Sequence, residues 1–93
     1  MTLAEEPYRV VFTATAKRAL TDGLPEDVAT AAWELITGTL AANPHRVGKP
    51  LNEPFERLHA ARRGTYRVTY RMNHTTRTIT VIAIKHRKDA YLA

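Results

Sequence analysis

The strongest constraint on the fold is a pair of strand patterns in the second half of the chain. Apolar or aromatic side chains alternate with polar ones over residues 66–73, which is typical of a half-buried strand. Residues 78–85 are rich in β-branched side chains and are apolar from Ile79 to Ile84, which predicts an interior strand buried on both faces. Only residues 74–77 separate the two segments, so we expect them to be antiparallel neighbours.

The segments before this pair add helices and two further strands. Thr13 or Thr15 can cap the first helix, and Gly23 is expected to end it in the left-handed conformation. The predicted elements are a strand over 8–13, a helix to about Asp22, a helix from Pro25 to about Ala42, a loop over 45–54, a weak strand over 55–61, and a turn over 62–65. We therefore expect one α+β domain over residues 1–93, in the order β-α-α-β-β-β. A small antiparallel sheet would be packed on one face by an N-terminal helical hairpin.

Charge is distributed unevenly along the chain. The net charge is +5, but residues 1–44 hold three basic and six acidic groups, whereas residues 45–93 hold eleven basic and three acidic groups. Ten of the fourteen cations are arginine, whose planar fork matches phosphate. This imbalance indicates a polyanionic partner, either nucleic acid or an acidic protein segment. A cationic surface that only keeps the protein soluble is the alternative.

Several classes of function are excluded or disfavoured. Cysteine is absent, so disulfides and thiolate metal sites are ruled out. The histidines at 45, 59, 74 and 86 do not follow metal-ligand spacings, and we expect no metal and no cofactor. Apolar runs are too short to span a bilayer, and no apolar signal core follows Met1. The expectation is a soluble, cytoplasmic protein with no membrane partner.

The remaining candidates for chemistry are cations and a phenol. Strand alternation places Arg67 on the face opposite Tyr66, and Arg87 follows the interior strand, so the two arginines can converge at one end of the sheet. Guanidinium groups suit phosphodiester chemistry because they offset charge on the non-bridging oxygens. Tyr91 is a candidate proton carrier if nearby cations favour its phenolate, and His86 is an alternative acid or base.

Three blocks of sequence in the second half resemble one toxin family. They are "GKPL" at 48–51, "R-x-G-x-Y-R-V-x-Y" at 62–70, and "H-R-x-D-x-Y" at 86–91. In this order they resemble the RelE/ParE superfamily of toxins from type II toxin–antitoxin modules, and in particular its RelE-like, messenger-RNA-cleaving branch. The resemblance extends over about residues 8–91.

The resemblance implies a ribosome-dependent endoribonuclease that inhibits translation. Such toxins cut messenger RNA at the decoding site, near 16S ribosomal RNA, through the ribose 2′-hydroxyl and without a metal, and each is paired with a cognate antitoxin. By this likeness Arg67 stabilises the scissile phosphate, Arg87 stabilises the transition state or protonates the leaving group, and Tyr91 orients or deprotonates the 2′-hydroxyl. Candidate RNA contacts are Arg46, Lys49, Arg62, Arg63, Arg71, Lys85 and Lys88.

The chain departs from the RelE-like pattern at one strand. Leu58 and Ala60 stand where some of these toxins carry lysines. Either Lys49, Arg62, Arg63 or His86 compensates for them, or catalysis is slower or organised differently. Two other functions stay open: a ParE-like inhibitor of DNA gyrase that does not hydrolyse nucleic acid, and an RNA-binding module without catalysis.

Overall fold

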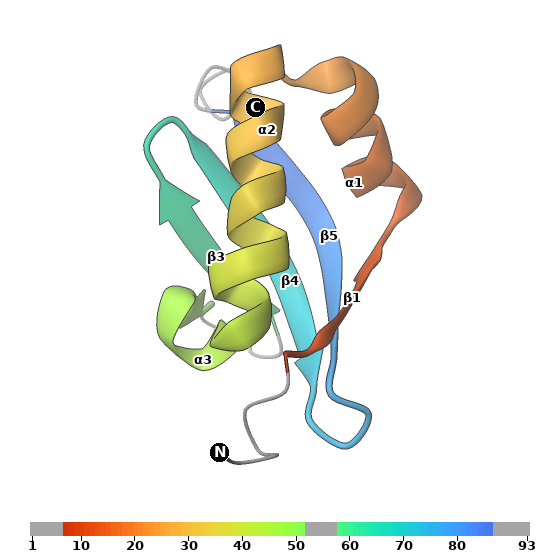
Figure 1. Ribbon diagram of the computed structural model, residues 1–93, viewed down its shortest axis with the longest axis vertical. Coiled ribbons are helices and arrows are strands. Elements are labelled where there is room, and N and C mark those ends of the chain that lie inside the picture. The colour runs from red at the N-terminus through yellow and green to blue at the C-terminus, as the bar shows by residue number, and fades with distance from the viewer. Residues whose placement is uncertain (1–6, 52–57, 87–93) are drawn as a thin grey trace.

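Five strands form one sheet in the order β1-β5-β4-β3-β2 (Figure 1). The computed structural model describes residues 7–51 and 58–86. The strands are β1 (Arg9–Phe12), β2 (Lys49–Pro50), β3 (Leu58–Arg63), β4 (Tyr66–Asn73) and β5 (Thr78–His86). The α+β class, the antiparallel meander of β3, β4 and β5, and the interior place of β5 are confirmed. The sheet as a whole is mixed, because β1 joins β5 in the parallel direction.

Helical segments between β1 and β2 cover one face of the sheet (Figure 1). They are α1 (Ala14–Arg18), the π-helical segment η2 (Ala19–Gly23), α2 (Glu26–Leu35), the π-helical segment η3 (Ile36–Leu40) and α3 (Pro44–Val47). The predicted helical hairpin is therefore present. In each π-helical region a threonine hydroxyl, of Thr21 or of Thr37, donates to the carbonyl four residues earlier, at 3.1 and 2.8 Å. Such bonds compete with the regular helix ladder and favour a widened turn.

The predicted helix boundaries were partly right. Thr13 is the N-cap of α1, and its hydroxyl accepts a hydrogen bond from the Ala16 backbone N–H at 3.2 Å. The expectation that Gly23 ends the helix in the left-handed conformation was wrong. Gly23 closes η2, Leu24 is extended, and the described residues with positive φ are Gly64 and Arg77. The helix therefore ends in a π-helical turn, and Gly23 does not adopt the left-handed conformation.

The predicted loop over 45–54 contains two short elements. Pro44 begins α3, where its missing N–H costs nothing, and Lys49–Pro50 pairs with β3 as strand β2. The weak strand is shifted toward the C-terminus, since β3 runs to Arg63 and leaves only Gly64 and Thr65 as the turn. Residues 55–57 of the predicted strand lie outside the described residues. Gly64 adopts φ 54°, the left-handed conformation that a tight hairpin needs.

A β-bulge sets which residues of β5 enter the core. Thr69 pairs with Ala83 and Tyr70 with Val81, so Ile82 is skipped in the register. The extra residue allows Val81 and Ile84, three positions apart, to face the helices and be buried. The prediction that both faces of β5 are buried was wrong, because Thr80, Ile82 and Ala83 are only half-buried.

Tyr70 connects the sheet to α3 through the centre of the core. Its side chain is fully buried, and its hydroxyl donates to the Pro44 carbonyl at 2.6 Å. Burial raises the pKa of Tyr70 to about 12, so the phenol stays protonated and keeps this hydrogen bond.

None of the described helices is long and apolar enough to cross a membrane.

Candidate functional site

Three cations lie side by side on the face of the sheet that the described helices leave uncovered, called the open face below. Arg67 of β4 is directly opposite Arg62 of β3 on one side and Lys85 of β5 on the other. Directly opposed residues have Cβ atoms about 5 Å apart, and like charges there are destabilising. We call Arg62, Arg67 and Lys85 the cation row. Repulsion between these three positive side chains is expected to lower the stability of the fold.

The described carboxylates lie on the face of the sheet opposite the cation row. Asp22, Glu26, Asp27 and Glu34 are the acidic residues within the described ranges, and all lie in η2 and α2. These helical segments cover the other face of the sheet (Figure 1). The cation row is thus suited to an anion supplied by another molecule, and a phosphodiester has the geometry that paired guanidinium groups recognise.

Small side chains form the floor next to the cation row. Ala60, Thr69 and Ala83 occupy the adjacent row on the same face, and Lys49 of β2 stands directly opposite Ala60. Arg71 lies one step further along β4. Arg67 is half-buried, whereas Lys49, Arg62, Arg71 and Lys85 are exposed. The arrangement is a cationic surface beside a row of small side chains.

The strand register separates the four residues that could replace the missing lysines. Lys49 and Arg62 share the open face with Arg67. Arg63 and His86 are both paired with Tyr66, on the face that the helices cover. Burial raises the pKa of Tyr66, so this neighbouring phenol stays protonated. Lys49 and Arg62 are therefore the residues placed to supply positive charge beside Ala60.

The other candidates fall in three places. Arg46 is exposed on α3, away from the cation row. His86 is half-buried at the end of β5. Arg87, Lys88 and Tyr91 lie outside the described residues. The structure thus brings together Arg67, Arg62 and Lys85, with Lys49 and Arg71 close by, and does not bring Arg46 or Arg63 to them.

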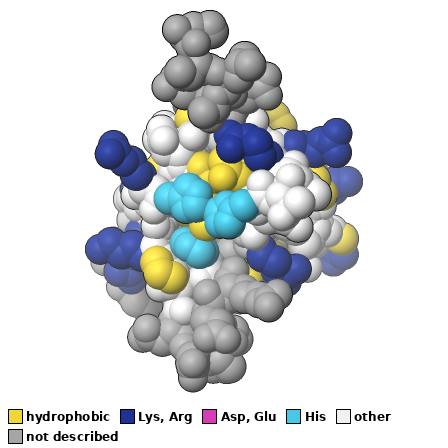
Figure 2. All heavy atoms as spheres, turned by 90° about the horizontal axis from the view of Figure 1, so that it is seen from below, with side chains coloured by type: hydrophobic (Ala, Val, Ile, Leu, Met, Phe, Trp, Pro, Cys, Tyr) yellow, Lys and Arg dark blue, Asp and Glu magenta, His cyan; other side chains and the backbone are white. Residues whose placement is uncertain are grey.

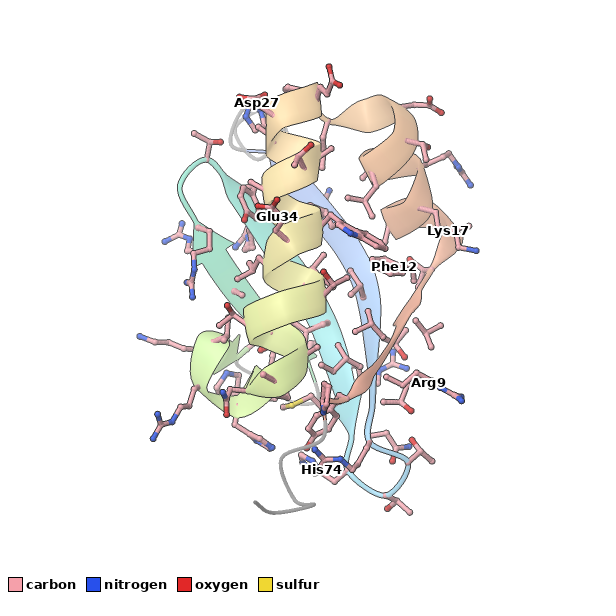
Figure 3. The ribbon with its side chains drawn as sticks, in the orientation of Figure 1. Arg9, Phe12, Lys17, Asp27, Glu34 and His74 are labelled. Carbon is pink, nitrogen blue, oxygen red and sulfur yellow. The ribbon has the colours of Figure 1, made fainter. Side chains whose placement is uncertain are left out.

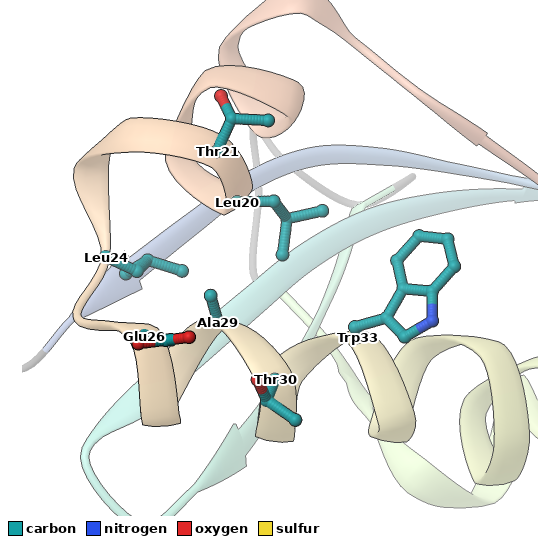
Figure 4. Close-up of a pocket in the computed structure, with 7 residues that line it drawn as sticks. All are labelled: Leu20, Thr21, Leu24, Glu26, Ala29, Thr30 and Trp33. Carbon is teal, nitrogen blue, oxygen red and sulfur yellow. The ribbon is translucent and has the colours of Figure 1, made fainter.

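A groove on the helical side offers a contrasting environment. It has a volume of about 550 Å³ and lies between η2 and α2, lined by Leu20, Leu24, Trp33 and four other residues (Figure 4). Trp33 is 50% exposed and stacks on Phe12, with ring centroids 5.7 Å apart. None of the described residues that line this groove is Lys, Arg or His, and Glu26 would repel a phosphate. The cation row therefore remains the candidate site.

His59 makes the stability of the fold depend on pH. Burial lowers the pKa of His59 from 6.5, and the nearby His45 and His74 lower it further. The unfolded chain then binds this proton more readily, so the stabilisation is complete above pH 6.5 and is lost as the pH falls through the folded pKa. Urea unfolding at about pH 7.5 and about pH 5.5 should show a lower unfolding free energy at the acid end. A His59→Gln variant should show a weaker pH dependence, and an unchanged dependence would contradict this assignment.

Comparison with known proteins identifies the family. Residues 10–91 match the family described as the ParE toxin of the type II toxin–antitoxin system parDE. Toxin RelE of Mycobacterium tuberculosis is 46% identical over 87 residues, which cover 94% of this chain and 89% of that protein. This chain belongs to the RelE/ParE superfamily of type II toxins. The resemblance drawn from the three sequence blocks is confirmed.

Two further relatives place this toxin within the superfamily. Toxin RelG of the same organism is 42% identical over 85 residues, covering 91% of the chain and 97% of that toxin. A chain of the crystal structure of the toxin–antitoxin complex RelBE2 from M. tuberculosis is 41% identical, with a TM-score of 0.83, over 88% of this toxin and all of that chain. The isolated Escherichia coli RelE toxin shares the fold, with a TM-score of 0.69 at 17% identity.

Proposed function

We propose that this toxin is a ribosome-dependent endoribonuclease that cuts messenger RNA and thereby inhibits translation. The observation that carries the proposal is the cation row, which gathers three positive side chains on an open sheet face away from the described carboxylates. Arg67 lies at its centre and is the least exposed of the three. Partial burial strengthens its interaction with a phosphate, because less water screens the charge.

The reaction uses the RNA's own nucleophile. The 2′-oxygen of the ribose attacks the neighbouring phosphorus, the bond from phosphorus to the 5′-oxygen breaks, and the products are a cyclic phosphate and a 5′-hydroxyl end. Arg67 offsets the negative charge that grows on the non-bridging oxygens. The 2′-hydroxyl loses one proton and the leaving oxygen gains one. No cofactor is needed, since the cations, a proton carrier and the substrate complete the step.

We assign the proton transfers to residues that follow β5. Tyr91 takes the proton from the 2′-hydroxyl, and Arg87 acts on the leaving group, as the likeness to RelE-like toxins implies. His86 is the weaker candidate, because its pairing with Tyr66 puts it on the face opposite Arg67. The RNA backbone is held by Lys49, Arg62, Arg71 and Lys85 on the open face, with Arg46, Arg63 and Lys88 as outer contacts.

A comparison of two targets tests this proposal. The match to the ParE toxin family favours a second candidate, a gyrase inhibitor that binds without cutting nucleic acid. Purified toxin should cleave messenger RNA on translating ribosomes and leave DNA supercoiling by gyrase unchanged. Inhibition of supercoiling without messenger cleavage would replace the proposal with the second candidate. We place the action of the toxin in the cytoplasm, where translating ribosomes are found.

The proposed regulator is a cognate antitoxin. Structures similar to this toxin include the RelBE2 complex and the archaeal RelE–RelB complex from Pyrococcus horikoshii, which has a TM-score of 0.68 at 25% identity. An antitoxin segment that covers the cation row needs acidic side chains to match it. The association rate between toxin and antitoxin should therefore fall as salt rises, measurable by stopped-flow fluorescence. A salt-independent rate would indicate a mainly apolar interface instead.

A further inference from the structure

Two exposed histidines are stacked at the end of the molecule opposite the cation row. His45 of α3 and His74 of the β4–β5 turn have ring centroids 4.8 Å apart and planes inclined by only 14°. The Tyr8 hydroxyl lies 3.4 Å from Nε2 of His45 and 3.3 Å from Nδ1 of His74. Figure 2 shows histidine side chains gathered at the centre of this underside, with Lys and Arg around them. We call His45 and His74 the histidine stack.

The Tyr8 hydroxyl is shared between the two rings of the histidine stack. A hydroxyl donates one hydrogen bond and accepts from other donors, so it can bridge two rings by donating to one nitrogen and accepting from the other. With both rings charged, Tyr8 can no longer donate to either nitrogen, and two like charges face each other. An anion placed against the stack removes that penalty. Protonation and anion binding therefore favour each other.

The outer nitrogens of the stack are available to a ligand. Among the described residues, Nδ1 of His45 and Nε2 of His74 have no hydrogen-bond partner, and both side chains are exposed. The nearly parallel rings do not aim their nitrogens at one point, and no three His, Cys, Asp or Glu side chains within the described ranges could hold a metal ion. The free N–H groups instead suit the oxygens of an anion.

The charged groups around the stack are cationic wherever they are described. The Arg77 guanidinium lies 4.3 Å from the centre of the Tyr8 ring, Arg46 adjoins His45 on α3, and His59 of β3 is close enough to interact electrostatically. The buried Tyr70 hydroxyl is engaged by the Pro44 carbonyl. Described acidic residues such as Asp27 and Glu34 lie toward the other end, and Figure 3 shows both far from His74.

We propose that the histidine stack, with Arg46 beside it, is a second contact for the backbone of single-stranded RNA that strengthens as the pH falls. The inference rests on the proposed function, because RNA is the polyanion that the cation row would already hold. Arg67 and His74 are seven positions apart along β4 and its turn, which corresponds to about 23 Å, with Arg71 between them. One strand of RNA several nucleotides long can follow this path. Aromatic rings at an exposed site can also stack on unpaired bases, which an acidic protein segment does not have.

RNA binding without ribosomes tests the second contact directly. Fluorescence anisotropy with a labelled single-stranded RNA of mixed sequence would give the affinity at about pH 8 and about pH 6. From about pH 8 to about pH 6, the RNA affinity of the wild-type protein should increase about fivefold more than that of the His45→Gln/His74→Gln variant. A fivefold change in affinity corresponds to the contribution of one exposed ion pair. Glutamine keeps a polar side chain at each site but does not titrate. Equal gains in both proteins would overturn the proposal.

Two controls keep the result interpretable. Lys17→Gln removes a cation from α1, far from His74 (Figure 3), and should keep the wild-type gain. In wild-type protein, which needs no variant to fold, the Cε1–H resonances of His45 and His74 should shift when RNA is added at the lower pH. A pH-dependent gain seen with poly-glutamate and not with RNA would assign the surface to an acidic protein and overturn the RNA proposal. Because no ribosome or cleavage enters this assay, its outcome is separate from that of the messenger-cleavage test.

Discussion

Replacing Arg67 with alanine should lower messenger cleavage on translating ribosomes by about 10²- to 10³-fold, the loss typical of removing one donor to a developing oxyanion. The side chain lies at the centre of the cation row, between Arg62 and Lys85, and points away from the helical core. Its removal relieves repulsion between like charges and leaves the core intact. The melting temperature should therefore stay near the wild-type value or rise while activity falls.

Matched variants separate catalysis from net charge. Arg67→Lys keeps the charge but loses the planar fork, so its cleavage rate should lie between those of wild type and alanine. Arg9→Ala removes an exposed arginine from β1, two strands away in the same sheet, and should cleave at close to the wild-type rate. Wild-type cleavage by Arg67→Ala would refute the site. RNA binding by wild-type protein with no cleavage would favour the non-catalytic RNA-binding module.

Replacing Gly48 with alanine should destabilise the fold by about 2–4 kcal/mol, toward the upper range for overpacking a core. An added Cβ would collide with the Tyr70 hydroxyl and lie 2.8 Å from Cζ of the same ring. The ring cannot move aside, because it is fully buried and its hydroxyl is held by the Pro44 carbonyl at 2.6 Å. Gly48 has an extended backbone, with φ −110°, so the cost comes from contact and not from conformation.

A second glycine and a double variant test this explanation. Gly38 lies in η3 with no atom within 4 Å of the added Cβ, so Gly38→Ala should stabilise the protein by about 0.5–1 kcal/mol. Combining Gly48→Ala with Tyr70→Phe removes the nearest clashing atom, so the pair should cost less than the sum of the single changes. Urea unfolding measures all four variants. Strict additivity would mean that the collision is not with the hydroxyl.

Alternation made β4 predictable and left β5 ambiguous. In β4 every second side chain is apolar, and the face assigned to Arg67 agrees with its neighbours across the sheet. In β5 the side chains from Ile79 to Ile84 are almost all apolar, so no alternation shows which of them face the helices. The bulge at Ile82 and the half-buried positions beside it could therefore not be predicted. The two-residue strand β2 and the one-turn helix α3 are too short to produce a periodic signal.

The sequence predicted the central residue of the candidate site, Arg67, but not which side chains lie beside it. Arg67 was identified from strand parity, but the alignment of Arg62 and Lys85 beside it depends on a register that only the folded sheet supplies. His86 was proposed as an acid or base because a histidine side chain ordinarily titrates near neutral pH, but the strand register puts it on the face opposite Arg67. The histidine stack joins residues 29 positions apart, His45 and His74, and no local pattern links them.

The position of β5 also determines when the sheet can be completed during synthesis of the chain. This strand separates β1 from β4 and pairs with both, yet it is the last of the five strands to be made. A nascent chain that has reached only residue 77 has no strand to pair with β1 and no Lys85 in the cation row, and its core lacks Ile79, Val81 and Ile84. Such distant pairings form late and slowly. The five-stranded sheet of this toxin can therefore be completed only after β5, which ends at His86, has been translated.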